Sequence, residues 1–202
     1  MAGHWDRVYG RRLPTEMSWY QEEPRVSLAL LDALDVTPQV AIVDVGGGAS
    51  VLVDRLLDRR FGDVSVLDVS AAALAHAKQR LAERAACVHW LREDVLTWRP
   101  ERRYGVWHDR AVFHFLVEEN ERAAYLASLR AALTPEGRVA IGTFAGDGPQ
   151  HCSGLPVQRY EAGALAAVFG AEFEVVEQRR EEHQTPNGTE QPFTWVGMVW
   201  HP

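Results

Sequence analysis

The chain has 202 residues, of which 47% are hydrophobic and 24% are charged, and its formal net charge is −7. This length and composition predict a single globular domain over residues 1–202 with a substantial core. The acidic balance excludes broad electrostatic binding to nucleic acid or to an anionic membrane, because such a surface neutralises no phosphate groups. No stretch has the pattern of a signal peptide or a membrane span, and the two cysteines are too few for a disulfide framework. We therefore expect a cytoplasmic protein that is a monomer or a small homo-oligomer.

The first 37 residues precede the first predicted strand and are rich in aromatic side chains, including Trp5, Tyr9 and Trp19. Aromatic residues interleaved with charged ones favour a lid that covers a binding site, although packing against the outside of a sheet would give the same pattern. Apolar residues at helical spacing from Pro24 to Leu34 then predict an amphipathic helix. We expect residues 1–37 to form this lid and helix, and residues 38–202 to form the core around a sheet.

Strands and helices are predicted to alternate through the rest of the chain. Apolar, β-branched runs indicate strands at about 40–45, 63–68, 87–92, 104–109, 138–144, 172–180 and 193–200. Helical patterns lie between them, around Val51 to Leu57, over 71–84, within 116–133 and over 161–169. This alternation predicts an α/β fold, a Rossmann-like doubly wound, mostly parallel sheet, and the last two strands form a C-terminal antiparallel hairpin.

The central motif is a buried strand that runs into an acid and three glycines, Asp44-Val45-Gly46-Gly47-Gly48. Glycine permits a tight turn at positive φ and a close approach of the backbone to a ligand. The helix that follows begins with free N–H groups, and Ser50 can cap it. This arrangement is typical of sites that bind a nucleotide or nucleoside cofactor.

Acidic residues stand at the ends of four successive predicted strands: Asp44, Asp68, Asp94 and Asp109. Parallel strands bring their carboxyl ends to one edge of the sheet, so we expect these acids to outline a single crevice. An acid at the end of the second strand can accept hydrogen bonds from both hydroxyls of a ribose. The pattern therefore predicts a nucleoside site at this edge.

These motifs resemble those of the class I S-adenosyl-methionine-dependent methyltransferases, in particular the small stand-alone bacterial ones, and the resemblance runs from about Trp5 to the last strand. It implies a seven-stranded sheet and S-adenosyl-L-methionine as the cofactor. Ser50 stands where the fuller family pattern has glycine.

The resemblance also implies roles for individual residues. The segment from Asp44 through Gly46, Gly47 and Gly48 would lie against the amino-acid part of the cofactor, and Asp68 would hold the ribose. The adenine would lie near Val69, with its amino group at Asp94 and the backbone N–H of Val95. The N-terminal aromatic residues that would cover the cofactor are Trp5, Tyr9 and Trp19.

Candidate catalytic residues follow the fourth strand. Asp109 is expected to contact the cofactor or the acceptor, and His108 and His114 are further candidates for a general base. Such a base is required only if the acceptor arrives protonated. The loop 145–156, with glycines, prolines, His151 and Cys152, is a candidate part of the acceptor pocket. No ligand spacing supports a metal site.

The acceptor itself stays open at this stage. A compact domain with a closable loop favours a small molecule over a protein, whereas the Asp109-x-x-x-Phe113 spacing is similar to that of some elongation-factor lysine methyltransferases. The alternative is therefore a protein-lysine N-methyltransferase. An NAD(P)-dependent oxidoreductase fits less well, because the third glycine of its fingerprint would fall at Val51, and a non-catalytic protein that binds S-adenosyl-methionine is the remaining alternative.

Overall fold

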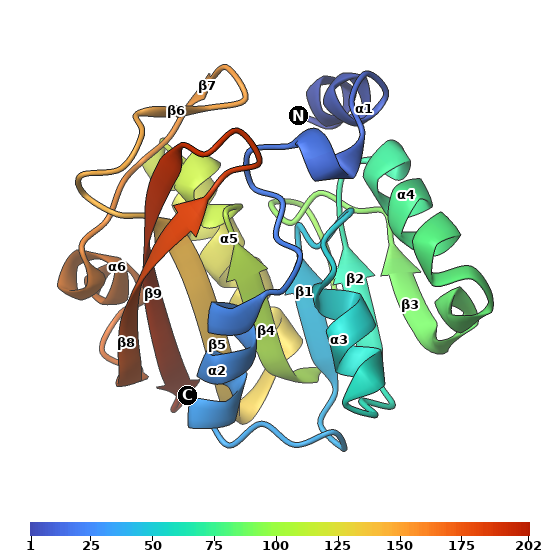
Figure 1. Cartoon of the computed structure of the whole chain (residues 1–202). Coiled ribbons are helices and arrows are strands. Elements are labelled where there is room, and N and C mark those ends of the chain that lie inside the picture. Colours follow the sequence, from blue (N-terminus) through green and yellow to red (C-terminus); the bar gives the residue numbers. More distant parts are fainter.

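The computed structural model describes all 202 residues, which form a seven-stranded sheet with helices on both faces (Figure 1). The strands of this sheet are β1 (Ile42–Val45), β2 (Val64–Leu67), β3 (Val88–Leu91), β4 (Tyr104–Arg110), β5 (Leu133–Phe144), β8 (Phe173–Gln184) and β9 (Glu190–Trp200). A separate small hairpin consists of β6 (His151–Cys152) and β7 (Leu155–Pro156). The α-helices are α1 (Ala2–Tyr9), α2 (Arg25–Ala33), α3 (Leu52–Asp58), α4 (Ala71–Leu81), α5 (Glu119–Ala132) and α6 (Ala162–Phe169). Short 3-10 helices lie at Pro14–Glu16, Ala82–Cys87 and Phe113–Phe115.

The strand order is β3-β2-β1-β4-β5-β9-β8. The first five strands are parallel, and β9 runs antiparallel between β5 and β8. The predicted Rossmann-like α/β fold with a C-terminal antiparallel hairpin is therefore confirmed. Because the chain returns from β3 at one edge to β4 beside β1, the order of the strands reverses at β1 and β4, which is where such sheets bind ligands.

The sheet is buried on both faces, as the apolar strand sequences require. Neighbouring residues of β1 point to opposite layers: Ile42 packs with α2, α3 and α4, and Val43 packs with α5 and α6. Both side chains are fully buried. No helix has the combination of length and apolar sequence that crossing a bilayer requires.

Some element boundaries differ from the predicted ones. The segment Thr134–Gly137, whose Pro-Glu-Gly sequence is typical of a turn, lies within β5, where the pairing with β4 jumps from Leu133 to Arg138 and the residues between bulge out. The helix predicted over 71–84 ends at Leu81, and a 3-10 helix follows. Tertiary pairing thus extends a strand through a local turn signal.

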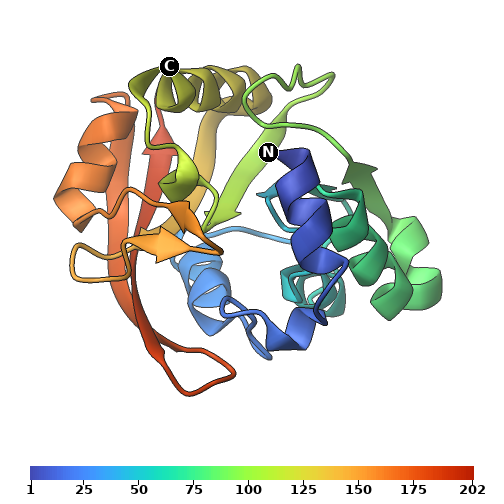
Figure 2. The same ribbon diagram turned by 90° about the horizontal axis from the view of Figure 1, so that it is seen from above.

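The N-terminal segment (residues 1–23) lies over the carboxyl ends of the parallel strands, with α1 above α4 (Figure 1). Seen from above, α1 and the β6–β7 hairpin lie on opposite sides of the middle of the sheet (Figure 2). The Asp6 carboxylate fixes α1 to the beginning of α4, since it accepts hydrogen bonds from the Ser70 hydroxyl at 2.7 Å and from the Ala72 N–H at 3.2 Å. These bonds hold the N-terminal segment above the edge of the sheet where the acids gather.

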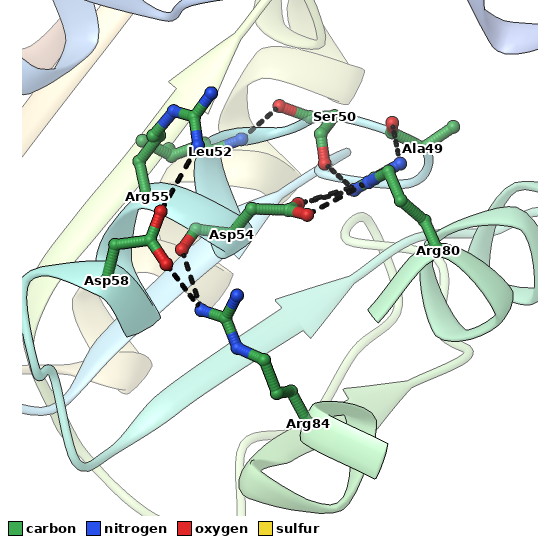
Figure 3. A network of polar contacts seen from close by, with 8 residues as sticks. All are labelled: Ala49, Ser50, Leu52, Asp54, Arg55, Asp58, Arg80 and Arg84. Carbon is green, nitrogen blue, oxygen red and sulfur yellow. Dashed lines mark hydrogen bonds and ion pairs between the residues drawn. The ribbon is translucent and has the colours of Figure 1, made fainter. Parts of the chain in front are cut away.

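An arginine of α4 ties that helix to the end of the glycine turn (Figure 3). The Arg80 guanidinium donates to the carbonyl oxygens of Ala49 at 2.9 Å and Ser50 at 2.6 Å, and it pairs with Asp54 of α3 at 2.7 Å. Arg84 lies nearby but holds only α3, through the Asp54 carbonyl and the Asp58 carboxylate. Arg80 therefore fixes the position of the turn as well as the packing of the two helices.

We expect Arg80→Ala to lower the free energy of unfolding by about 1–2 kcal/mol, because the two carbonyl oxygens and Asp54 lose their donor. The matched variant Arg84→Ala is expected to cost less than about 1 kcal/mol, since its bonds are exposed and only to α3. Urea denaturation at pH 7 measures both values. Equal losses for the two variants would contradict a special role for Arg80.

Candidate functional site

A pocket opens at the carboxyl edge of the parallel strands, with an empty volume of about 880 Å³ that includes its mouth. The predicted site residues that line it are Trp5, Tyr9, Trp19, Gly46, Asp68, Val69, Asp94 and Val95. The lining residues that were not predicted include Met1, Glu93, Arg110, Ala111, Val112, Phe115, Phe144 and Phe193. Cys152 of the predicted loop 145–156 also lines the pocket.

The glycine turn after β1 reaches this pocket through Gly46. Gly46 has a φ of +67°, and a Cβ there would collide with the side chain of Val112. Gly48 has a φ of +35°, and its Cβ would lie 2.5 Å from the Asp68 Oδ2. Both positions therefore require glycine for conformation and for space. Of the three glycines, Gly46 lines the main pocket, whereas Gly47 and Gly48 are buried.

Asp68 stands at the end of β2 with 8% of its surface exposed. Its Oδ1 accepts a hydrogen bond from the Ser70 N–H at 2.7 Å, and the residue lines the pocket. Burial, together with the negative charges of Asp44 and Asp6, raises the pKa of Asp68 to about 7 against the lowering effect of the Ser70 N–H. Such a carboxylate gains from a ligand that donates hydrogen bonds, as ribose hydroxyls do.

Asp44 lies on the other face of the glycine turn and keeps one oxygen free. Its Oδ1 accepts from Nδ1 of His108 at 2.7 Å, whereas Oδ2 is enclosed and has no hydrogen-bond partner. A Cβ at Gly47 would collide with this carboxylate. Asp44 lines a smaller cavity that shares Gly46 with the main pocket. An unpartnered buried carboxylate oxygen fits a positively charged donor such as the ammonium group of an amino acid.

A further group of pocket residues follows the ends of β2 and β3. Asp94 and Val95 follow β3 and line the pocket together with Val69. Asp94 shapes its own loop, because its Oδ1 accepts from the Leu96 N–H at 3.0 Å. The residues expected at the ribose and the adenine thus lie at one end of one pocket.

Three aromatic residues of the N-terminal segment close this pocket from above. Trp19 packs edge-on against Trp5 at 5.8 Å and against Tyr9 at 6.0 Å between ring centroids. The Trp19 indole N–H also donates to the Tyr9 hydroxyl at 3.2 Å. Trp5 packs in the same way against Phe115, on the far wall, at 5.2 Å. The N-terminal segment therefore spans the pocket from one wall to the other.

The three predicted catalytic residues do not line the main pocket. His108 and Asp109 lie on β4, whose neighbouring residues face opposite layers of the molecule, and His114 lies on the 3-10 helix that follows. His108 points toward α2 and faces only the smaller cavity, and the Ser27 hydroxyl lies 2.9 Å from its Nε2. With Asp44 on its other nitrogen, both nitrogens of the buried ring are engaged. His108 positions Asp44 and is not placed to act as a base on an acceptor.

Asp109 faces the opposite layer and is completely buried. Its carboxylate accepts hydrogen bonds from Val112 N–H at 2.9 Å, Phe113 N–H at 3.2 Å and the Tyr125 hydroxyl at 2.6 Å. Burial raises the pKa of Asp109 to about 6, although these bonds lower it. Asp109 therefore holds the loop 110–113 and does not line the main pocket, and its contact with cofactor or acceptor stays a prediction.

His114 is also completely buried. Its Nδ1 accepts a hydrogen bond from the Phe144 N–H at 3.3 Å, and its Nε2 is enclosed without a partner. Burial, and to a smaller extent the charge of Arg110, lowers the pKa of His114 to about 3. The imidazole is thus neutral at physiological pH and lies behind the wall of the pocket, so the prediction of a catalytic base there is not supported.

Among the unpredicted lining residues, Arg110, Phe144 and Phe193 lie on β4, β5 and β9, and Phe115 lies on the 3-10 helix Phe113–Phe115. Arg110 carries the one signal that the sequence could have offered, since it directly follows Asp109 at the end of a predicted strand. Phe144 ends β5 and Phe193 lies within β9, and both strands have the sequence pattern of ordinary core. No group of three or more His, Cys, Asp or Glu side chains is arranged to hold a metal ion.

We expect Asp109→Ala to lower the free energy of unfolding by about 2–4 kcal/mol, because it leaves the Val112 N–H, the Phe113 N–H and the Tyr125 hydroxyl without an acceptor. Asp109→Asn retains one acceptor oxygen and should lose less. Denaturation in the absence of any ligand measures both. An alanine variant as stable as the parent would contradict this positioning role and would support Asp109 as a free, functional carboxylate.

Comparisons with known proteins agree with this geometry. A family model described as a methyltransferase domain matches residues 43–139. The malonyl-[acyl-carrier protein] O-methyltransferase 1 of Ilyobacter polytropus is 26% identical over 132 residues, which cover 62% of this chain and 47% of that protein. The EEF1A lysine methyltransferase 2 of Danio rerio is 29% identical over 150 residues, 66% of this chain and 64% of that protein. The chain thus spans less than two thirds of either relative.

A solved structure shares the fold across the whole chain. The Burkholderia thailandensis 1,6-didemethyltoxoflavin-N1-methyltransferase, crystallised with 1,6-didemethyltoxoflavin and S-adenosylhomocysteine, has a TM-score of 0.71 at 19% identity and covers 100% of this chain and 84% of its own. The comparisons therefore show a likeness to a methyltransferase domain over residues 43–139 and, over the whole chain, the fold of a solved methyltransferase.

Proposed function

We propose that this chain is an enzyme that transfers a methyl group from S-adenosyl-L-methionine to a small-molecule acceptor. One observation carries the proposal: Gly46, Asp68 and Asp94 lie at one end of a pocket whose other end is walled by Phe115, Phe144 and Phe193. A cofactor at the first end leaves the second free for an acceptor beside it. Trp5, Tyr9 and Trp19 of the N-terminal segment line the same pocket.

The residues present fit this cofactor. Asp68 offers a carboxylate for the ribose hydroxyls, and Asp94, Val69 and Val95 lie where an adenine would extend. The unpartnered Oδ2 of Asp44 offers an acceptor for the ammonium group of the methionine part. When bound, the cofactor supplies a methyl group on a sulfonium, whose leaving thioether is neutral.

Such a transfer asks the protein mainly to align two molecules and to exclude water, and positioning of this kind supplies up to about 7–11 kcal/mol of a barrier. Trp5 and Trp19 close the pocket above, and Phe115 and Val112 form its wall beside Gly46. The loop carrying Val112 is held by the buried Asp109. We infer that Asp109 and His108 are positioning residues and that the acceptor enters in a form that needs no base from either.

The alternative is methylation of a protein lysine, which the similarity to the Danio rerio enzyme favours. The pocket favours a small molecule, because the contact of Trp5 with Phe115 narrows its entrance. Incubation with S-adenosyl-methionine labelled in its methyl group and a cell lysate separated by size distinguishes the two. Label in the low-molecular-weight fraction supports the proposal, and label in protein alone supports the alternative.

Asp68→Ala should weaken binding of S-adenosylhomocysteine by about 1–3 kcal/mol, because the ribose loses charge-assisted hydrogen bonds. Titration calorimetry measures the change. The control is Asp63→Ala, at the opposite end of β2, where the side chain pairs with Arg102 outside the pocket. Equal affinity of the parent and the Asp68 variant would count against the assigned cofactor site.

Binding of the nucleoside part should depend on pH through Asp68. Its pKa of about 7 in the free protein means that protonation competes with ribose binding below neutrality. We therefore expect the affinity for 5′-methylthioadenosine, which lacks the amino-acid group, to fall by about 10-fold from pH 8 to pH 6. The variant Asp68→Asn does not titrate and should show a flat profile. The same slope in both proteins would assign the effect to another group.

A further inference from the structure

Arg110 is the last residue of β4 and the one charged side chain placed among the aromatic residues at the second end of the pocket. Its Cζ lies 4.5 Å from the centre of the Phe193 ring, a cation–π contact. Its Nη1 donates to the Trp19 carbonyl oxygen at 2.9 Å, under the N-terminal segment. Only 11% of the side chain is exposed. A buried guanidinium of this kind requires partners for its other N–H groups.

Those partners are missing. The Nε and Nη2 atoms of Arg110 are enclosed and make no hydrogen bond. The nearest carboxylate is that of Glu181, whose Oε2 lies 4.0 Å from Nε. Both Glu181 oxygens already accept hydrogen bonds, from the Trp195 indole at 2.7 Å and from the Gln21 amide at 2.5 Å. Arg110 therefore keeps an unused pair of donors and a positive charge that Glu181 balances only at a distance.

The neighbouring histidines provide no counter-charge for Arg110, because an imidazole is either neutral or positively charged. His114 is held neutral by burial, and the imidazole of His183 is bonded through Nε2 to the Ser18 carbonyl oxygen at 2.7 Å. The rest of the wall is apolar, with Phe144, Phe193 and the buried thiol of Cys152. An anion is the ligand that this end of the pocket lacks.

The position of Arg110 in the sheet separates it from the nucleoside end. Asp68 and Asp94 follow β2 and β3 on one side of β1, whereas Arg110 ends β4 on the other side and stacks on a residue of β9. Nε and Nη2 form one edge of the planar guanidinium, which binds a carboxylate through two parallel hydrogen bonds. Because the arginine stem is flexible, this edge can turn into the pocket that Arg110 already lines.

We propose that the methyl acceptor is a small organic carboxylate with an aromatic or apolar body, whose carboxylate pairs with Nε and Nη2 of Arg110 while its body packs against Phe144 and Phe193. This rests on the function proposed above and names the chemical class of its substrate. The carboxylate of the cofactor's own methionine part is the competing source of the same charge, and the experiment separates the two.

The experiment measures binding of acid and amide pairs to the protein saturated with S-adenosylhomocysteine, by calorimetry at pH 7.5. The pairs are benzoate with benzamide and phenylacetate with phenylacetamide. We expect at least one acid to bind about 10-fold or more tightly than its amide, the range of a charge-assisted hydrogen bond. Arg110→Gln should abolish that preference, and Arg110→Lys should retain part of it because it keeps the charge. The control Arg180→Gln changes an exposed arginine that pairs with Asp147 outside the pocket, and it should behave like the parent.

The affinity of each variant for S-adenosylhomocysteine and for 5′-methylthioadenosine identifies the source of the anion. Unchanged affinity for both in Arg110→Gln supports the acceptor. A loss confined to S-adenosylhomocysteine assigns Arg110 to the cofactor carboxylate and overturns the proposal, as does equal binding of acid and amide, or of neither, by the parent. Failure of the parent to bind S-adenosylhomocysteine would instead refute the proposed function. Arg110→Lys and the comparison of acid with amide in the parent keep the test valid should Arg110→Gln not fold.

Discussion

The structure of the site depends on one constraint, the lack of room for any side chain at the turn after β1. The Val112 side chain occupies the space that a Cβ on Gly46 would need, and the Asp68 carboxylate lies against Gly48. The turn can therefore bring an acid of β2 and a loop from β4 close together over bare backbone. The Arg80 hydrogen bonds to the carbonyl oxygens of Ala49 and Ser50 hold the end of this turn.

The acids at the strand ends fall into two groups, those that face the main pocket and those that bond to other parts of the protein. Asp68 and Asp94 face the pocket, whereas Asp109 holds a loop from below and Asp44 is shared between His108 and the smaller cavity. Alternation along β4 is the reason. Asp44 pairs in register with His108, so these two side chains share a layer, and the next residue faces the opposite one. One further step returns Arg110 to the layer of His108, beside the pocket.

A lid made of the N-terminal segment is consistent with how that segment is held. Asp6 bonds to the beginning of α4, and the Tyr9 carbonyl oxygen lies 3.1 Å from Nε2 of His76 on the same helix. Tyr9 and Met17 also pack with Ala49 and Ala73 in a small apolar cluster. The aromatic contacts of Trp5 with Trp19 and with Phe115 are made across the pocket.

The sequence alone determined the fold class, the order of strands and helices, and the residues expected around the nucleoside, because these depend on local patterns: apolar runs, glycines at a turn and acids at strand ends. Only the tertiary structure decided which of the adjacent residues His108, Asp109 and Arg110 reaches the main pocket, since a shift of one residue along a strand moves a side chain to the other face of the sheet. The tertiary structure also brought Phe144 and Phe193 together at the second end of the pocket, through the antiparallel pairing of β5 with β9. No local pattern records that pairing, because it joins segments that lie far apart in the chain.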